Sequence, residues 1–136
     1  YLAEGDEGAE GSFMIGTVFG DMHDIGKNIV LSMIRGTGFS TIDLGINVKA
    51  ETFVEEVRAQ QPDILGLSAL LTTTMPEMRN VIEALEAAGL RNTVKIIVGG
   101  APVNESFARK IGADGYAKDA GAAITLAKEF LKKETA

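Results

Sequence analysis

The stretch DILGLSALLTTTMPEMRNVIEALEAAGLRNTVKIIVGG, residues 63–100, decides the fold class. It begins and ends with short, almost continuously apolar runs, as expected of strands that a sheet buries on both faces. In the middle, apolar residues recur at steps of three or four, the spacing of one buried helix face: Met75, Met78, Ile82, Leu85 and Ala88. Pro76 suits a first helical turn, and Gly89 suits a helix exit. The segment therefore predicts a strand, a helix and a second, parallel strand.

The same alternation extends through the rest of the chain. Apolar runs occupy residues 13–19, 39–45, 63–70, 94–100 and 113–117, and helical spacing occupies residues 28–38, 51–61, 76–89, 105–112 and 122–133. This pattern predicts one doubly wound α/β domain with a five-stranded parallel sheet, for which we expect the flavodoxin-like (Rossmann-like) order 2-1-3-4-5. The Gly- and Glu-rich residues 1–12 are predicted to be a linker or disordered tail before a domain at 13–136.

Composition limits the functions to be considered. The 136 residues suit a single domain, and 46% of them are hydrophobic. Lys and Arg number 13 against 19 Asp and Glu, a net charge of −6, which argues against nucleic acid or an anionic membrane as the main partner. Cys is absent, so disulfides, thiolate metal sites and cysteine nucleophiles are excluded. We expect a cytoplasmic domain, and the start at Tyr1 suggests a fragment of a longer protein.

Ligands of open parallel sheets bind at the carboxyl ends of the strands, which singles out residues 19–27, 68–75, 99–104 and 116–120. The first of these loops holds His23, the only histidine, two residues from Asp21. A carboxylate that accepts one ring N–H is the usual support of a metal-binding imidazole. One histidine cannot hold zinc, so the pair suits a metal that a macrocycle already holds. Gly26 would let the backbone turn sharply or approach a bulky group. The alternative is a solvated histidine in a surface loop.

At this point the sequence resembles a known family. Residues 21–26, Asp-Met-His-Asp-Ile-Gly, fit the Asp-x-His-x-x-Gly signature of cobalamin-binding domains. Ser68-Ala69-Leu70 and Gly99-Gly100 match two further motifs of that family, and the resemblance covers residues 13 to about 133. Within the family, the chain is more similar to methionine synthase and the corrinoid proteins of methyltransferase systems than to adenosylcobalamin mutases. Mutases tend to place Gly and Arg where this chain has Met22 and Ile25.

The resemblance implies a role for the residues of the first and third loops. His23 would replace the cofactor's own base as the lower axial ligand of cobalt, and Asp21 would hydrogen-bond the other ring nitrogen. Met22, Asp24, Ile25 and Gly26 would belong to the same cofactor-binding loop. A hydroxyl after the third strand would complete the relay. The matching position holds Thr74, where methionine synthases have Ser, while Thr72 and Thr73 are alternatives. Thr74 could equally cap the helix that begins at Pro76.

The resemblance also implies that the nucleotide tail of the cofactor lies along the sheet. Ser68 would hydrogen-bond it, Leu70 would pack on the cofactor, and Gly99 and Gly100 would let the backbone approach it, with help from Gly66. Tyr116 and Ala117 would line the same slot. Two alternatives remain open, because the two glycines also suit a tight turn and Tyr116 also suits a sheet edge.

The expected function is that of a corrinoid subunit, not a complete enzyme, which carries a methyl group on cobalt between partner methyltransferases. The cofactor would be cobalamin or a related corrinoid in its methylcobalamin form. The family carries a helical cap domain before the sheet domain, and residues 1–12 are too short to form it. An adenosylcobalamin mutase small subunit and a cobalamin-sensing regulator are alternatives.

An alternative of another class is a phosphoacceptor receiver domain. Asp21 and Asp24 would supply its acidic pair and Lys118 its lysine. The third strand, however, ends in Ser68 where the phosphorylated Asp would stand, and Asp63 lies at the opposite end of that strand.

Overall fold

A computed structural model describes residues 11–135 and confirms the predicted α/β architecture. All strands are parallel, and their order is β2-β1-β3-β4-β5, as expected. The strands are β1 (Ser12–Val18), β2 (Ser40–Val48), β3 (Ile64–Ser68), β4 (Lys95–Gly99) and β5 (Gly115–Tyr116). The helices are α1 (Ile25–Gly36), α2 (Ala50–Gln60), α3 (Pro76–Ala87), α4 (Glu105–Ile111) and α5 (Ala120–Thr135), with a short 3₁₀ turn, η2 (Arg91–Thr93).

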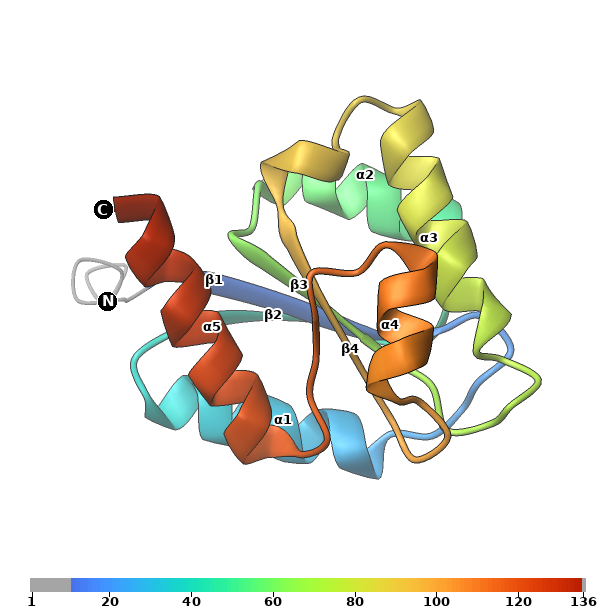
Figure 1. The fold of residues 1–136 in the computed structure, drawn as a ribbon, viewed down its shortest axis with the longest axis horizontal. Coiled ribbons are helices and arrows are strands. Elements are labelled where there is room, and N and C mark those ends of the chain that lie inside the picture. Colours follow the sequence, from blue (N-terminus) through green and yellow to red (C-terminus); the bar gives the residue numbers. More distant parts are fainter. Residues whose placement is uncertain (1–10, 136) are drawn as a thin grey trace.

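The sheet lies between two helical layers. Helices α1 and α5 pack on one face, and α2, α3 and α4 pack on the other (Figure 1). Because side chains of a strand point alternately to opposite faces, each strand supplies both cores. In β1, Met14 and Val18 belong to the core under α2 to α4, whereas Phe13 and Ile15 belong to the core under α1 and α5.

Several boundaries differ from the predicted ones. Helix α1 begins at Ile25 and not at residue 28, because the Asp24 carbonyl already accepts the N–H of Asn28 at 2.9 Å. Gly26 is therefore helical and does not make the sharp turn that we considered, which falls instead at Gly20 (φ 86°). Ser12 belongs to β1, where its N–H donates to Asp63 at 2.9 Å. Residues 1–10 of the predicted tail lie outside the described residues.

Within residues 11–135, none of the helices combines the length and the apolar character needed to cross a bilayer.

Candidate functional site

A cavity of about 740 Å³ opens at the carboxyl ends of the strands, on the side of the sheet that α1 and α5 cover. It reaches along the sheet as far as Phe13, Ile15 and Ile97. The sequence-predicted residues that line it are Met22, His23, Asp24, Ile25, Gly26, Ser68, Leu70, Gly99, Gly100 and Ala117. The predicted loops after β1, β3, β4 and β5 thus meet at one site. Its volume falls within the range of about 300–1,000 Å³ that is common for ligand pockets.

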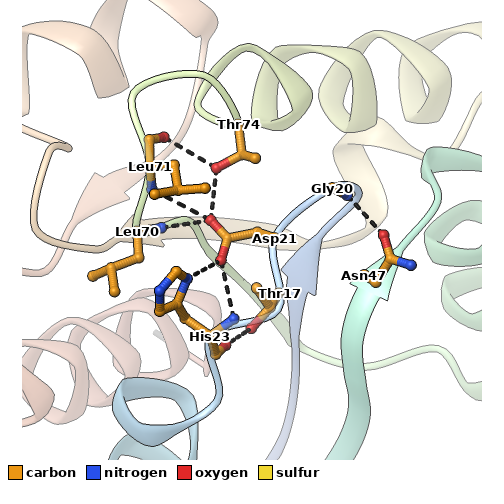
Figure 2. A network of polar contacts seen from close by, with 8 residues as sticks. All are labelled: Thr17, Gly20, Asp21, His23, Asn47, Leu70, Leu71 and Thr74. Carbon is orange, nitrogen blue, oxygen red and sulfur yellow. Dashed lines mark hydrogen bonds and ion pairs between the residues drawn. The ribbon is translucent and has the colours of Figure 1, made fainter.

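The His23 ring is held by one nitrogen. Nδ1 of His23 lies 2.8 Å from Oδ1 of Asp21, and the His23 backbone N–H donates to the same oxygen at 3.1 Å (Figure 2). The imidazole is 49% exposed and lies on the cavity, whereas the Asp21 side chain is completely buried. An ionised Asp21 selects the tautomer with the proton on Nδ1, which leaves the lone pair of Nε2 for a ligand.

The second oxygen of Asp21 is occupied by the loop after β3. Oδ2 accepts the N–H groups of Leu70 at 2.8 Å and Leu71 at 3.3 Å, and it lies 2.6 Å from the Thr74 hydroxyl (Figure 2). Burial raises the pKa of Asp21, but the hydrogen bonds from Thr74, Leu70 and His23 outweigh it and hold that pKa well below its usual range. Asp21 is therefore a carboxylate at neutral pH, as the tautomer argument requires.

Of the threonines after β3, Thr74 contacts Asp21. It is buried, and its hydroxyl also lies 3.0 Å from the Leu71 carbonyl. Thr72 is exposed and is not among the residues that bond Asp21. The N-cap position of α3 falls on Met75 and has no side-chain cap, so the alternative in which Thr74 caps this helix is wrong.

The backbone of the His23 loop has two supports that sequence reasoning missed. Thr17 is completely buried in β1, and its hydroxyl donates to the His23 carbonyl at 3.0 Å. Asn47, near the end of β2, accepts the Gly20 N–H on Oδ1 at 2.7 Å (Figure 2). Its own backbone N–H donates to the Asp21 carbonyl at 3.0 Å. A polar residue inside the apolar run 13–19 was the available signal for Thr17, but nothing local singles out Asn47.

Lys27 is a further residue that we did not predict. Its side chain is only 1% exposed, and Nζ lies 3.0 Å from Asp24, 2.9 Å from Asp43 and 2.8 Å from Asn28. Burial lowers the pKa of Lys27, but the hydrogen bonds to Asp43 and Asp24 outweigh it and raise that pKa above its usual value. Lys27 therefore ties the first turn of α1 to β2. Its spacing from the buried Leu31 was the signal that could have revealed it.

The glycines give the cavity walls without side chains. A Cβ on Gly100, which has φ 131°, would collide with the Ala69 carbonyl, and one on Gly99 would come within 2.9 Å of the Ala117 carbonyl. Both glycines therefore serve the close approach of strand ends, as the turn alternative held, and both also line the cavity. Gly66 lines it as well, and a Cβ there would lie 3.1 Å from the Phe13 ring. Gly26, in contrast, faces open space.

The two residues predicted at the end of β5 separate. Ala117 lines the cavity, but Tyr116 packs against the core under α2 to α4. Tyr116 is the last residue of β5, and its side chain faces the layer of α2 to α4, whereas Ala117 follows the strand and packs in the core under α1 and α5. Tyr116 is therefore not brought to the site, and this part of the prediction is corrected.

These residues fit a corrinoid. Among residues 11–135, no group of three or more His, Asp or Glu side chains could hold a bare metal ion. A lone imidazole, fixed on Nδ1 by a buried carboxylate, suits instead a metal that brings its remaining ligands with it. The glycine-walled cavity beside it offers room for a tail attached to such a macrocycle.

Comparison with known proteins shows which proteins this chain is similar to. The B12 binding domain family matches residues 11–125. A dimethylamine corrinoid protein of Methanosarcina mazei is 50% identical over 121 residues, which are 89% of this chain and 72% of that protein. The crystal structure of a cobalamin-binding protein from Desulfitobacterium hafniense DCB-2 is similar with a TM-score of 0.85 and 41% identity, over 88% of this chain and 58% of that one.

A second similar structure is the methanol:cobalamin methyltransferase complex MtaBC of Methanosarcina barkeri, with a TM-score of 0.86 and 33% identity. The similarity covers 91% of this chain and 47% of the other, so this chain spans about half the length of the protein it matches there. The signal receiver domain of NarL from Mycobacterium tuberculosis is 16% identical with a TM-score of 0.66, a likeness that shows the fold alone.

Proposed function

The chain belongs to the B12 binding domain family, and from this premise we propose that it carries a methyl group, on the cobalt of a bound corrinoid, between partner methyltransferases. The observation that carries the proposal is the Asp21–His23 pair at 2.8 Å, with the free edge of the imidazole on the cavity. Such a chain is the corrinoid subunit of a methyltransferase system. The identity of 50% with a dimethylamine corrinoid protein makes methylated amines the first methyl donors to test.

Each residue of the site has a defined part in this proposal. Nε2 of His23 would be the lower ligand of cobalt, and Asp21 would hold the Nδ1 proton and orient the ring. Gly66 and Gly99 would wall the slot for the nucleotide tail, with Ser68 at its rim as a hydrogen-bond partner. When bound, the corrinoid supplies a cobalt that accepts and releases a methyl group.

The buried carboxylate keeps its charge through its bonds to Leu70 and Thr74. As an acceptor, Asp21 would hold the N–H of His23 at Nδ1 and leave the lone pair of Nε2 for the cobalt.

The test is the visible spectrum of the protein reconstituted with methylcobinamide, which has no nucleotide tail and therefore no nitrogen base of its own. We expect the spectrum of nitrogen-coordinated cobalt to change to that of the uncoordinated form in His23→Ala, because the chain has no other imidazole. Met22→Ala, which alters the neighbouring cavity wall but removes no ring nitrogen, is the matched control. Identical spectra for His23→Ala and the unaltered protein would exclude His23 as the axial ligand. Methyl transfer from dimethylamine is then measured in the reconstituted system with the same variants, and we expect His23→Ala to lose it.

A further inference from the structure

Thr17, in strand β1, holds the main chain of His23 by a hydrogen bond. Because side chains alternate along β1, Thr17 faces the same side of the sheet as Phe13 and Ile15, which line the cavity, and it is completely buried. The first backbone hydrogen bond of helix α1 has the Asp24 carbonyl as its acceptor. The His23 carbonyl, one residue earlier, therefore takes no part in the helix and can accept from another donor. The Thr17 hydroxyl is that donor, at 3.0 Å (Figure 2). A buried hydroxyl in a strand needs a partner, and this partner is the backbone of the proposed axial ligand.

Asn47 holds the same loop from the side of β2. It has φ 55°, a left-handed conformation that is uncommon outside glycine and that Asn tolerates better than most residues. Gln61, the other such non-glycine residue among those described, simply ends α2. Asn47 ends no helix. In this conformation its side chain accepts the Gly20 N–H (Figure 2), and its backbone N–H donates to the Asp21 carbonyl.

Together the two residues hold both ends of the segment 20–23. Asn47 fixes Gly20 and Asp21, and Thr17 fixes His23. The ring of His23 is hydrogen-bonded to Asp21, and Asp21 accepts a hydrogen bond from the loop after β3. The His23 loop is therefore supported at its main chain by two residues outside the binding motif and at its side chains by the motif itself.

We propose that Thr17 and Asn47 are positioning residues, which hold the His23 loop in the conformation that coordinates cobalt. The inference rests on the function proposed above. Ligand atoms of a functional site must be held to within about 0.5 Å and 10–20°. Loss of either support lets the loop move, and the imidazole then spends less time within bonding distance of a metal. We therefore expect such variants to fold normally but to coordinate cobalt through His23 less often.

The experiment uses cobinamide, a corrinoid that lacks the nucleotide tail and hence any base of its own. Nitrogen coordination in the complex must then come from the protein, and the visible spectrum reports it directly. Thr17→Val keeps the shape but removes the hydroxyl, and Thr17→Ser restores it. Asn47→Gly keeps the left-handed backbone but removes the acceptor, and Asn47→Asp retains an acceptor. Thermal unfolding of each variant without the corrinoid serves as the measure of folding.

We expect Thr17→Val to lower the equilibrium constant between coordinated and uncoordinated cobinamide about tenfold, as the loss of one partly buried hydrogen bond implies. Asn47→Gly should lower it about three- to fivefold, because the lost bond is exposed and therefore weaker. Thr17→Ser and Asn47→Asp should stay within about twofold of the unaltered protein on the same scale.

Each other outcome overturns a defined part of the argument. Coordination in Thr17→Val and Asn47→Gly equal to that of the unaltered protein would show that neither residue positions the loop, while the proposed function would stand. Equal losses in Thr17→Val and Thr17→Ser would assign the effect to packing and refute the role of the hydroxyl. If Thr17→Val does not fold, Asn47→Gly and Asn47→Asp decide alone. Absence of nitrogen coordination in the unaltered protein itself would overturn the proposed function and this inference with it.

Discussion

The hydroxyl of Thr74 lies 2.6 Å from Oδ2 of Asp21, although 53 residues separate the two along the chain. The contact joins the loop after β1 to the loop after β3, because these strands are neighbours in the sheet. It also leaves Oδ1 of Asp21 for His23. The orientation of the imidazole thus depends on a residue that lies far from it in the sequence.

Removal of this hydroxyl should destabilise the fold. In Thr74→Val, Asp21 stays buried with one donor fewer, and we expect the free energy of unfolding to fall by about 1–3 kcal/mol. Thr74→Ser keeps the O–H and should lose well under half of that. Urea denaturation at pH 7 measures both variants. Equal stability of Thr74→Val and the unaltered protein would mean that the contact contributes nothing to folding.

The stability of the fold should depend on the ionisation of Asp21 in acid. Its pKa in the folded protein is lowered, so the carboxylate contributes stability that is present above the unfolded pKa of about 3.9 and is lost as pH falls toward the folded value. In Asp21→Asn we expect a lower free energy of unfolding at pH 7, and the difference from the unaltered protein should shrink below about pH 4. Urea denaturation from pH 7 to pH 3 tests this, with Glu86→Gln on the exposed face of α3 as the control. A difference that stays constant down to pH 3 would contradict it.

Lys27 should matter at the opposite end of the pH scale. Its pKa is raised in the folded protein, so its contribution is fully present below the unfolded pKa of about 10.4 and is lost as pH rises through the folded value. Lys27→Met keeps an unbranched side chain but ends the ion pairs with Asp24 and Asp43, and we expect a loss of about 1–3 kcal/mol at pH 7. Lys110→Met, on an exposed position of α4, is the control for a lost charge. Urea denaturation at pH 7 and above pH 10 measures both variants. An equal change in the free energy of unfolding for Lys27→Met and Lys110→Met would contradict a stabilising role of the buried ion pairs.

Two glycines of the cavity should respond differently to alanine. Gly26 lies in the first turn of α1 with open space around it, so Gly26→Ala should leave stability unchanged or raise it by up to about 1 kcal/mol. The added methyl narrows the cavity, and we expect weaker cobalamin binding.

Gly100→Ala should destabilise the fold strongly, because its Cβ would collide with the Ala69 carbonyl at φ 131°. Thermal unfolding and cobalamin titration separate the two effects, and tighter binding by Gly26→Ala would contradict the placement of Gly26 at the ligand.

The sequence predicts the fold and the location of the site because both follow from local patterns. Continuous apolar runs identify buried strands, and helical spacing identifies α3, so the doubly wound class and the edge that carries the ligand loops follow from general rules. The order 2-1-3-4-5 was expected only as the commonest one for five such units, and the structure has it. The Asp21–His23 pair is also local, since two residues separate its members. These parts of the prediction needed no knowledge of which distant residues meet.

The remaining parts depend on contacts between distant segments. Thr72 and Thr74 look alike in sequence, and only the turn after β3 brings Thr74 and not Thr72 to Asp21. Asn47 approaches the His23 loop because β2 pairs with β1 through two register shifts, which no local pattern announces. Tyr116 faces the core under α2 to α4, and its strand of two residues is too short for a sequence pattern to show which side of the sheet it faces.

The alternation of β1 has a consequence for mutational scanning. One side of β1 faces the layer of α1 and α5, which contains the cavity, and carries Phe13, Ile15 and Thr17. The other side faces the core under α2 to α4 and carries Met14 and Val18. Substitutions at the odd positions should therefore be detected first as changes in corrinoid affinity or colour, and those at the even positions as changes in melting temperature. One strand of seven residues would then report, position by position, on two separable properties.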